Sequence, residues 1–409
     1  MVCVPKITHI VIGLYASEKK HRQSFERLRR YVEEVGGSDT AQSCNDALSY
    51  SLVNMIFDAK DNVLTTEDNQ EVDVVLHKVS TLSPNASSTL MEWCGVVSLR
   101  RHERGLPPVV IVDPLSSAEY VTRRSRVYER LGSKLPLPLC ITPRSWLWAR
   151  GDLSMRALLS PSYLLPHDRR DTTWWIAKTD LATGPSYTHR MVVWRGPRPE
   201  AALPPSVLAL LPVESTSFVV QEFFIEAVPF VIKVYCIGMF VGAKVVSTTP
   251  LLQLLRGQAL GDGNAEAIGE EPVCFDSQKV FTDKEEWKSD TELARCWQNF
   301  LSEGGHGYVQ CAHIAAQLAQ ELHLTLFGFD LLLVPRGRPA NDCPLLEMDR
   351  ASLFDSVTGA PTPLLSEALP VVVDVNYFPS FSGVRHMEQH VLDVIKTKVF
   401  GAGLQHGSC

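Results

Sequence analysis

The longest apolar stretch of the chain, from Phe218 to Val246, carries charged residues at intervals of four to eleven positions. These residues are Glu222, Glu226, Lys233 and Lys244. A helix that crosses a bilayer needs about 20 predominantly apolar residues in succession, and the charges leave no such run. The stretch therefore predicts buried β-strands, with a hairpin that turns at Gly238. We expect a folded globular protein that does not insert into a membrane.

Composition narrows the class of protein further. The 409 residues leave room for two or three domains of about 100 to 200 residues each. Hydrophobic residues make up 45% and charged residues 21%, which are ordinary globular values and argue against long disorder. The 39 basic and 46 acidic residues give a net charge of −7, which argues against general nucleic-acid binding. An anionic ligand must therefore meet a local cluster of basic residues.

The cysteines and the N-terminal residues indicate the cellular compartment of the protein. The ten cysteines include no CxxC pair and no Cys/His spacing of a zinc site, a pattern typical of a reducing compartment. The segment from Met1 to His9 contains Lys6 and lacks the apolar core of a signal peptide. We expect a cytoplasmic protein, with the nucleus as the alternative location, and a monomer.

The N-terminal region, residues 1–114, alternates apolar runs with a helical pattern, which predicts an α/β domain. A helix is expected where Phe25, Leu28, Val32 and Val35 recur at helical spacing. The expected strands are Ile7–Tyr15, Leu48–Phe57, Val72–Leu76 and Pro108–Val112.

The middle region, residues 115–220, predicts a mostly antiparallel unit. A basic helix is expected at Ser117–Leu131, and a proline-rich connection leads to a second helical stretch after Pro143. The expected strands are Trp174–Ala177, Met191–Trp194 and Phe218–Phe223.

The C-terminal region, residues 221–409, predicts a third unit of strands and one short helix. The glycine- and proline-rich stretches at about 251–287 and 335–370 are expected to be surface loops or insertions. The expected elements are strands Val231–Ile237 and Met239–Val246, helix His313–Leu322, and strands Leu324–Val334 and Val371–Tyr377. The three regions together predict an α/β (α+β) fold class.

Three oxygen-bearing residues lie on the last two expected strands. Asp374 and Asn376 are two positions apart, so their side chains leave the same face of a strand. Asp330 lies among apolar residues, where an unpaired carboxylate is costly to bury. Oxygen ligands on neighbouring strands suit a magnesium ion clamped to phosphate oxygens. The alternative is that both aspartates lie at strand ends and face water.

Basic residues occur at several strand positions. Lys178 and Lys233 each interrupt an apolar strand, where an ammonium group can receive a phosphate. Ser17–Lys20 and His77–Lys78 directly follow two expected strands, and ligands bind at the carboxyl ends of strands in α/β sheets. These cations suit a polyphosphate, although any one such residue more often lies on a solvated surface. The P-loop, the protein-kinase signatures and the GxSxG elbow are absent from the sequence.

Several short segments follow one another in a recognisable order. The first are Tyr15–Lys20, Asp73–Lys78 and Val112–Leu115. The later ones are Ala177–Thr179, Val219–Phe223, Lys233–Tyr235, Phe327–Asp330 and Val373–Pro379. In this order they resemble the inositol 1,3,4-trisphosphate 5/6-kinases, and the likeness covers almost the whole chain. The resemblance implies an ATP-grasp fold, with an N-terminal α/β domain ahead of two ATP-binding subdomains.

The resemblance also implies ligands and site residues. ATP would lie between two antiparallel sheets, and two magnesium ions would accompany it. The residues implied for ATP are Arg124, Lys178, Gln221, Glu222, Phe223 and Lys233. Those implied for an inositol phosphate are Lys20, Lys78, His189, Lys233, Asn376 and Gly383. Those implied for magnesium are Asp330, Asp374 and Asn376, while Lys233 and Asp330 are the implied catalytic residues.

Three positions depart from the pattern of that family. Thr183 stands before Gly184 where the family has a histidine, and Ser380 stands where it has a glycine. Thr249-Pro250-Leu251 replaces an arginine-proline-serine run. These departures concern substrate preference and rate more than ATP binding.

The leading hypothesis is an ATP- and magnesium-dependent kinase that phosphorylates a hydroxyl of an inositol tris- or tetrakisphosphate, of the inositol-tetrakisphosphate 1-kinase type. Such chemistry depends on positioning and charge neutralisation rather than on a strong base. One alternative is an ATP-grasp carboxylate–amine ligase, which has no evident need of Lys20, Lys78 and His189 together. Another is a catalytically silent protein that binds inositol phosphates.

Overall fold

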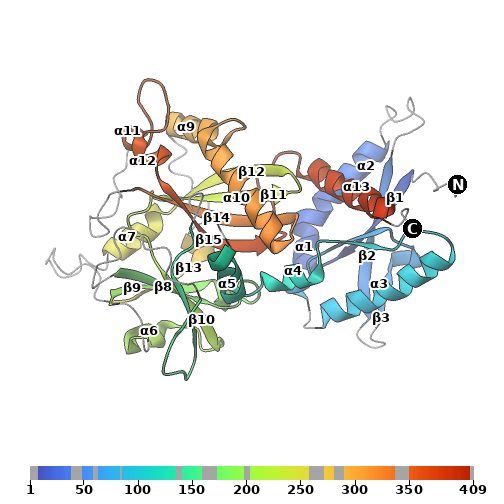
Figure 1. Cartoon of the computed structure of the whole chain (residues 1–409), viewed down its shortest axis with the longest axis horizontal. Helices are drawn as coiled ribbons and strands as arrows, with labels where there is room; N and C mark the ends of the chain where they lie inside the picture. Colours follow the sequence, from blue (N-terminus) through green and yellow to red (C-terminus); the bar gives the residue numbers. More distant parts are fainter. Residues whose placement is uncertain are drawn as a thin grey trace.

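Three β-sheets organise the protein (Figure 1). The structure, a computed structural model, describes residues 8–37, 48–58, 63–82, 85–134, 141–158, 173–197, 203–257, 271–280, 290–336 and 350–405. The first sheet precedes the other two along the chain, β13 joins the second sheet after β11 and β12 of the third, and the last helix returns to the first sheet.

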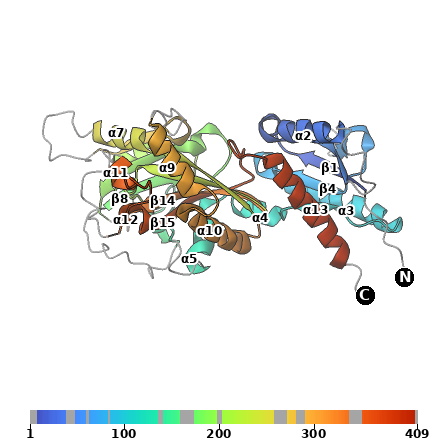
Figure 2. The ribbon, with the colours of Figure 1, turned by 90° about the horizontal axis from the view of Figure 1, so that it is seen from above.

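The first sheet has the strand order β3-β2-β1-β4-β5 and is parallel except for β3, which is antiparallel to β2. Its strands are β1 His9–Tyr15, β2 Ser49–Asp58, β3 Val63–Thr66, β4 Val74–His77 and β5 Val110–Val112. Its helices are α1 Glu18–Lys20, the π-helix η1 His21–Phe25, α2 Glu26–Gly37, α3 Ala86–Glu103, and the short 3-10 turns η3 Glu67–Asn69 and η4 Val79–Thr81. The C-terminal helix α13, Met387–Gln405, contacts β5 and α2, and both views place it beside this sheet (Figures 1 and 2).

The second sheet is antiparallel, with the order β13-β9-β8-β10-β6-β7. Its strands are β6 Ser145–Ala149, β7 Arg156–Ala157, β8 Thr173–Thr179, β9 Arg190–Gly196, β10 Ser217–Glu222 and β13 Val273–Asp276. Helix α6, Pro205–Leu210, contacts β9, and the 3-10 turn η5, Ser186–His189, joins β8 to β9. Bulky aromatic residues fill one buried cluster of this sheet: Trp146, Trp148, Trp175, Trp194 and Phe218. The antiparallel character expected for the middle region is confirmed.

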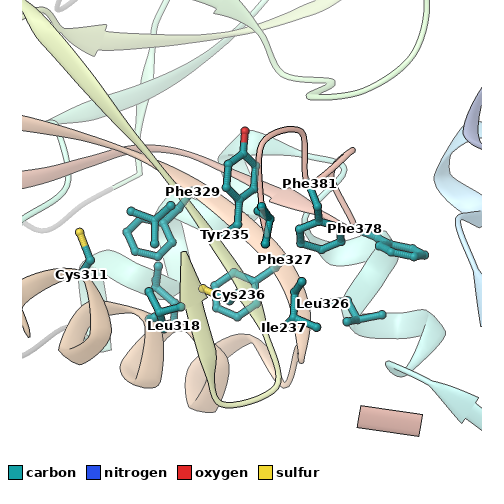
Figure 3. Close-up of a cluster of buried hydrophobic side chains, with 14 of the residues drawn as sticks. Tyr235, Cys236, Ile237, Cys311, Leu318, Leu326, Phe327, Phe329, Phe378 and Phe381 are labelled. Atoms are coloured by element: carbon teal, nitrogen blue, oxygen red, sulfur yellow. The ribbon is translucent and has the colours of Figure 1, made fainter. Parts of the chain in front are cut away.

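The third sheet is antiparallel, with the order β12-β11-β14-β15. Its strands are β11 Phe230–Ile237, β12 Phe240–Ser247, β14 Leu326–Val334 and β15 Leu369–Tyr377. Helices α9 Thr291–Leu301 and α10 His306–Leu322 pack on it. Cys236 and Phe327, which are paired in register, lie beside Leu318 of α10 in the buried core (Figure 3). One face of the sheet is therefore covered by helices, and the other face is left for polar side chains.

Two segments predicted to be single helices differ from the prediction: one is divided into two helices, and the other is a strand. The segment Ser117–Leu131 is divided into α4, Leu115–Tyr120, and α5, Arg124–Lys134. The chain breaks between them because the N–H of Arg124 donates to the carbonyl of Asp180 beyond β8. The second helical stretch predicted after Pro143 is wrong, since β6 occupies this place and pairs with β10. Its alternating, buried Trp146 and Trp148 favour an extended strand.

The stretches expected to be surface loops contain regular elements in their described parts. Within 251–287 these are most of α7 Thr249–Gly257, β13 and α8 Ser277–Val280. Within 335–370 they are α11 Arg350–Leu353, α12 Pro363–Ser366 and the first residues of β15. Leu251 and Phe275 are buried in the first stretch and Phe354 in the second, so these parts belong to the core. Residues 258–270, 281–289 and 337–349 lie outside the described ranges.

The α/β (α+β) fold class is confirmed by this mixture of one mainly parallel and two antiparallel sheets. The domain boundaries after residues 114 and 220, and the status of the two stretches as insertions, stay predictions. None of the described helices combines the length and apolar character needed to cross a bilayer.

Candidate active site

A cavity of about 390 Å³ lies between the second and third sheets. We call it the inter-sheet cavity, because β8, β9, β10 and β13 face β11, β14 and β15 across it. All the residues predicted to bind ATP or magnesium line this cavity: Arg124, Lys178, Gln221, Glu222, Phe223, Lys233, Asp330, Asp374 and Asn376. The fold thus gathers residues that are widely separated in the sequence.

Strand register places three of these residues in one row. Lys233 of β11 pairs with Asp330 of β14, and Asp330 pairs with Asp374 of β15. Residues directly opposite one another in antiparallel strands project from the same face, and so does Asn376, two positions beyond Asp374. Phe329, on the alternate face, lies in the core (Figure 3). The alternation of β14 therefore separates the polar row from the apolar core.

Opposite charges surround the two carboxylates. Lys233 Nζ lies 3.4 Å from Asp330 Oδ2, and Arg124 Nε lies 3.4 Å from Asp374 Oδ1. Asn376 Nδ2 donates to Asp374 Oδ2 at 3.2 Å. Burial raises the pKa of Asp330, Lys233 opposes this rise, and the Asp374 carboxylate adds to it. The Asp330 carboxylate in turn raises the pKa of Lys233.

Asp330, Asp374 and Asn376 form a donor set that fits a hard cation. Magnesium prefers oxygen ligands and binds through one or two carboxylates together with substrate phosphates. Two half-buried carboxylates that lie opposite each other repel, as the effect of Asp374 on the pKa of Asp330 indicates. A divalent cation would offset this repulsion, so the residues present suit magnesium.

Two buried cations, Lys178 of β8 and Arg124 of α5, approach the same carboxylates. Lys178 of β8 is 7% exposed, and burial lowers its pKa to about 8. Arg124 donates from Nη1 to the carbonyls of Thr179 and Leu181 at 2.7 and 3.0 Å, while its buried Nε makes no hydrogen bond among the described residues. The guanidinium is thus held in place, and its Nε faces the carboxylate of Asp374 at 3.4 Å.

The end of β10 forms one edge of the inter-sheet cavity. Gln221 is fully buried and donates from Nε2 to Ser145 Oγ at 2.9 Å. Glu222 accepts two hydrogen bonds of 3.0 Å from Arg144. Phe223 packs against an apolar cluster that lines the cavity. These contacts fix the strand end beside an apolar wall that suits a flat ring.

A second cavity, of about 670 Å³, lies between α1 and β4 on one side and the third sheet on the other. We call it the inter-lobe cavity, because it lies between the lobe built on the first sheet and the lobe built on the second and third sheets. It is lined by five of the residues predicted to bind an inositol phosphate: Lys20, Lys78, His189, Lys233 and Asn376. The sixth, Gly383, is exposed and lines neither cavity. Its role therefore stays a prediction without a place in the site.

Positive charge predominates in the inter-lobe cavity. Apart from His189, the charged side chains that line it among the described residues are Lys19, Lys20, Lys78, Lys233 and Asp330. The two cavities adjoin, since they share five polar lining residues: His189, Lys233, Gln278, Asp330 and Asn376. A group bound in one cavity can therefore reach a group bound in the other beside Lys233 and Asp330.

Lys20 and Lys78 are buried and donate to main-chain carbonyls at and just after the end of β15. Lys20 Nζ donates to Phe378 O at 2.9 Å and to Pro379 O at 2.6 Å, and Lys78 Nζ donates to Tyr377 O. Burial lowers the pKa of Lys78 to about 7. Burial also lowers the pKa of Lys20, and the charge of Lys78 adds to that effect. An anion in the cavity would favour the protonated form of both lysines.

Sequence reasoning gave no role to three polar side chains of the inter-lobe cavity. Ser80 Oγ and Thr183 Oγ1 are buried oxygens without a hydrogen-bond partner among the residues described. Gln278 forms a hydrogen bond of 3.0 Å with His189. Only Thr183 carried a signal in the sequence, as a departure from the family pattern. No signal in the sequence indicated Gln278, because the stretch that contains it is expected to be a surface loop.

Comparisons with known proteins bear on the fold. No protein-family model matches the chain, and no curated protein matches it. Among solved structures, the ATP-grasp ligase PsnB complexed with a minimal precursor, Mg and ADP is 13% identical, with 97% of this chain and 99% of that chain covered and a TM-score of 0.38. Macrocyclase MdnC from Microcystis aeruginosa MRC, bound with precursor peptide MdnA, is 8% identical, with 95% and 99% covered and a TM-score of 0.39. N5-carboxyaminoimidazole ribonucleotide synthetase from Thermotoga maritima is 11% identical, with 94% and 76% covered and a TM-score of 0.40.

These likenesses, at such low identity and TM-scores, carry no argument about reaction or substrate. The chain's own architecture matches the ATP-grasp fold that the resemblance implied, because two antiparallel sheets enclose a cavity lined by cations and carboxylates. The predicted fold is thus confirmed, whereas the predicted role of each residue stays open.

Proposed function

We propose that this protein transfers the γ-phosphoryl group of ATP, with magnesium, to a hydroxyl of an inositol tris- or tetrakisphosphate. The observation that carries the proposal is the charge of the inter-lobe cavity, whose described lining includes four lysines and one aspartate: Lys19, Lys20, Lys78, Lys233 and Asp330. A cavity lined in this way favours an acceptor with several phosphate groups, because each ammonium offsets one negative charge.

ATP is assigned to the inter-sheet cavity. Gln221, Glu222 and Phe223 would border the adenine ring, and the buried cations Arg124 and Lys178 would face the phosphates. Asp330, Asp374 and Asn376 would hold magnesium, which when bound supplies positive charge to the phosphate oxygens. Each of these assignments places an anion beside a cation and the ring beside apolar side chains.

The reaction follows from the contact between the two cavities. The acceptor hydroxyl oxygen forms a bond to the γ-phosphorus while the bond between that phosphorus and the β,γ-bridging oxygen breaks, and ADP leaves. Lys233, at the junction, stabilises the charge on the transferred group. The proton of the hydroxyl passes to Asp330 or to solvent, since Asp330 lines both cavities and burial raises its pKa.

The second candidate is the ATP-grasp carboxylate–amine ligase that the sequence left open, and one similar structure is named an ATP-grasp ligase. Its first step would also be phosphoryl transfer, to a carboxylate oxygen in place of a hydroxyl. An amine would then displace the phosphate, so a ligase releases free phosphate whereas a kinase leaves the phosphate on the product. The lysine-rich inter-lobe cavity favours the kinase.

The test incubates purified protein with ATP, magnesium and a panel of inositol tris- and tetrakisphosphates. ADP, free phosphate and product isomers are measured, and Asp374→Ala serves as the blank. The proposal predicts one phosphorylated inositol for each ADP, with no matching release of phosphate. Absence of turnover with every inositol phosphate, despite detectable ATP binding, would contradict it. Release of phosphate equal to ADP in the presence of a carboxylate and an amine would favour the ligase.

A further inference from the structure

The last strand of the inter-sheet cavity contains a β-bulge. Asp330 pairs with Asp374, but the next residue of β14, Leu331, pairs with Val372. Val373 is therefore the extra residue of β15 and has no partner in the register. Both Val373 and Asp374 line the inter-sheet cavity, so the bulge lies directly beside a candidate magnesium ligand.

Two buried side chains from other elements share the carbonyl of Val373. Tyr128 of α5 donates from its hydroxyl at 2.5 Å, and Lys178 of β8 donates from Nζ at 3.1 Å. Tyr128 is 1% exposed and does not line the cavity, whereas Lys178 does.

The shared carbonyl has a consequence for phosphate binding. An ammonium that turns from Val373 toward a phosphate gives up its hydrogen bond to the carbonyl. A buried carbonyl left without a donor costs far more than the net value of one hydrogen bond. The carbonyl keeps a donor, however, because the Tyr128 hydroxyl remains in place.

We infer that Tyr128 is a positioning residue, which keeps the Val373 carbonyl satisfied and so frees the Lys178 ammonium for the phosphates of the nucleotide. This inference rests on the proposed function, since it takes the inter-sheet cavity as the ATP site. It goes beyond that function by giving a role to a helix residue that does not touch the nucleotide. It also gives the bulge a role. Because Val373 has no partner in the strand register, its carbonyl can accept hydrogen bonds from both Tyr128 and Lys178.

The test measures the dissociation constants of ADP with magnesium and of adenosine for Tyr128→Phe. The variant removes the hydroxyl alone, and Lys178 still covers the carbonyl in the free protein. ADP binding is expected to weaken roughly tenfold, because movement of Lys178 toward the phosphates then leaves the Val373 carbonyl without a hydrogen-bond donor. Adenosine has no phosphate to attract Lys178, so its binding is expected to stay unchanged. The matched control is Tyr120→Phe, which removes a hydroxyl that donates to the carbonyl of Arg126 away from the cavity, and it should change neither constant.

Equal weakening of ADP and adenosine by Tyr128→Phe would show a merely structural role and overturn the inference, and so would unchanged ADP binding. The ratio of the two constants cancels the fraction of folded protein, so the comparison holds even for a less stable variant. A wild-type protein that binds ADP but phosphorylates no inositol phosphate would refute the proposed acceptor and leave the role of Tyr128 to be decided by the ratio. A wild-type protein that binds neither ligand would refute both proposals.

Discussion

Lys20 donates a hydrogen bond of 2.6 Å to the carbonyl of Pro379, 359 positions later in the sequence. Its Nζ also donates to Phe378 O and lies 4.0 Å from the centre of the Phe378 ring. A lysine from the first lobe thus anchors the segment that directly follows Asn376. Lys20 therefore has two functions in this protein, since it lines the inter-lobe cavity and joins the two lobes that form it.

The substitution Lys20→Met tests this double function. It removes a buried donor from two carbonyls, so we expect the free energy of unfolding to fall by about 2 kcal/mol in urea denaturation. We also expect the KM for the inositol phosphate to rise at least tenfold, as a charge facing the acceptor is lost. Lys19→Met, at an exposed position, should change the free energy of unfolding by less than about 0.5 kcal/mol. Equal stability of the two variants would contradict the anchoring role.

The pH dependence of stability reports on Lys78. Burial lowers its pKa from 10.5 to about 7, so between these values the unfolded chain binds more protons at this site than the folded protein does. Stability must therefore rise with pH across this window, as far as Lys78 contributes. We expect wild-type protein to gain more free energy of unfolding between pH 7 and pH 10 than Lys78→Met, measured by urea denaturation at each pH. Parallel curves for the two proteins would show that Lys78 does not titrate in this way.

Asp113 is a second link between the lobes and can be tested by an isosteric change. Its fully buried carboxylate accepts hydrogen bonds from Thr325 N, Thr325 Oγ1 and Leu326 N, at 2.6 to 2.8 Å. Asp113→Asn turns one acceptor into a donor that faces a donor, so we expect a loss of about 2 kcal/mol in the free energy of unfolding. The exposed Asp152→Asn is the control and should leave stability unchanged. Similar midpoints for both variants would refute the link.

Thr183 is one of three places where this chain departs from the family it resembles. Its hydroxyl oxygen is buried beside the inter-lobe cavity and has no partner among the described residues, so we expect a polar acceptor bound there to supply the hydrogen bond that it lacks. Thr183→Val keeps the shape and removes the hydroxyl. We expect the KM for the inositol phosphate to rise roughly fivefold while the KM for ATP stays the same. The control is the exposed Ser186→Ala, and an equal rise in both KM values would assign Thr183 a structural role instead.

Local patterns in the sequence were sufficient where a feature depends on neighbours along the chain. Asp374 and Asn376 share a face because the side chains of a strand alternate with a period of two. Lys178 and Lys233 stood out because each interrupts an apolar strand. The helix predicted after Pro143 is wrong, because the short run around Trp146 and Trp148 pairs with β10 and forms a strand.

The sequence by itself therefore determined most strands, the residue types of the site and the resemblance that led to the ATP-grasp fold. The tertiary structure alone decided that Lys233, Asp330 and Asp374 form one row, because register is set by pairing between strands that lie far apart in the chain. It also decided that Lys20 and Lys78 are buried against carbonyls after β15, and that Tyr128 and Lys178 share the carbonyl of Val373. These contacts join distant segments and depend on packing, which no local pattern of residues records.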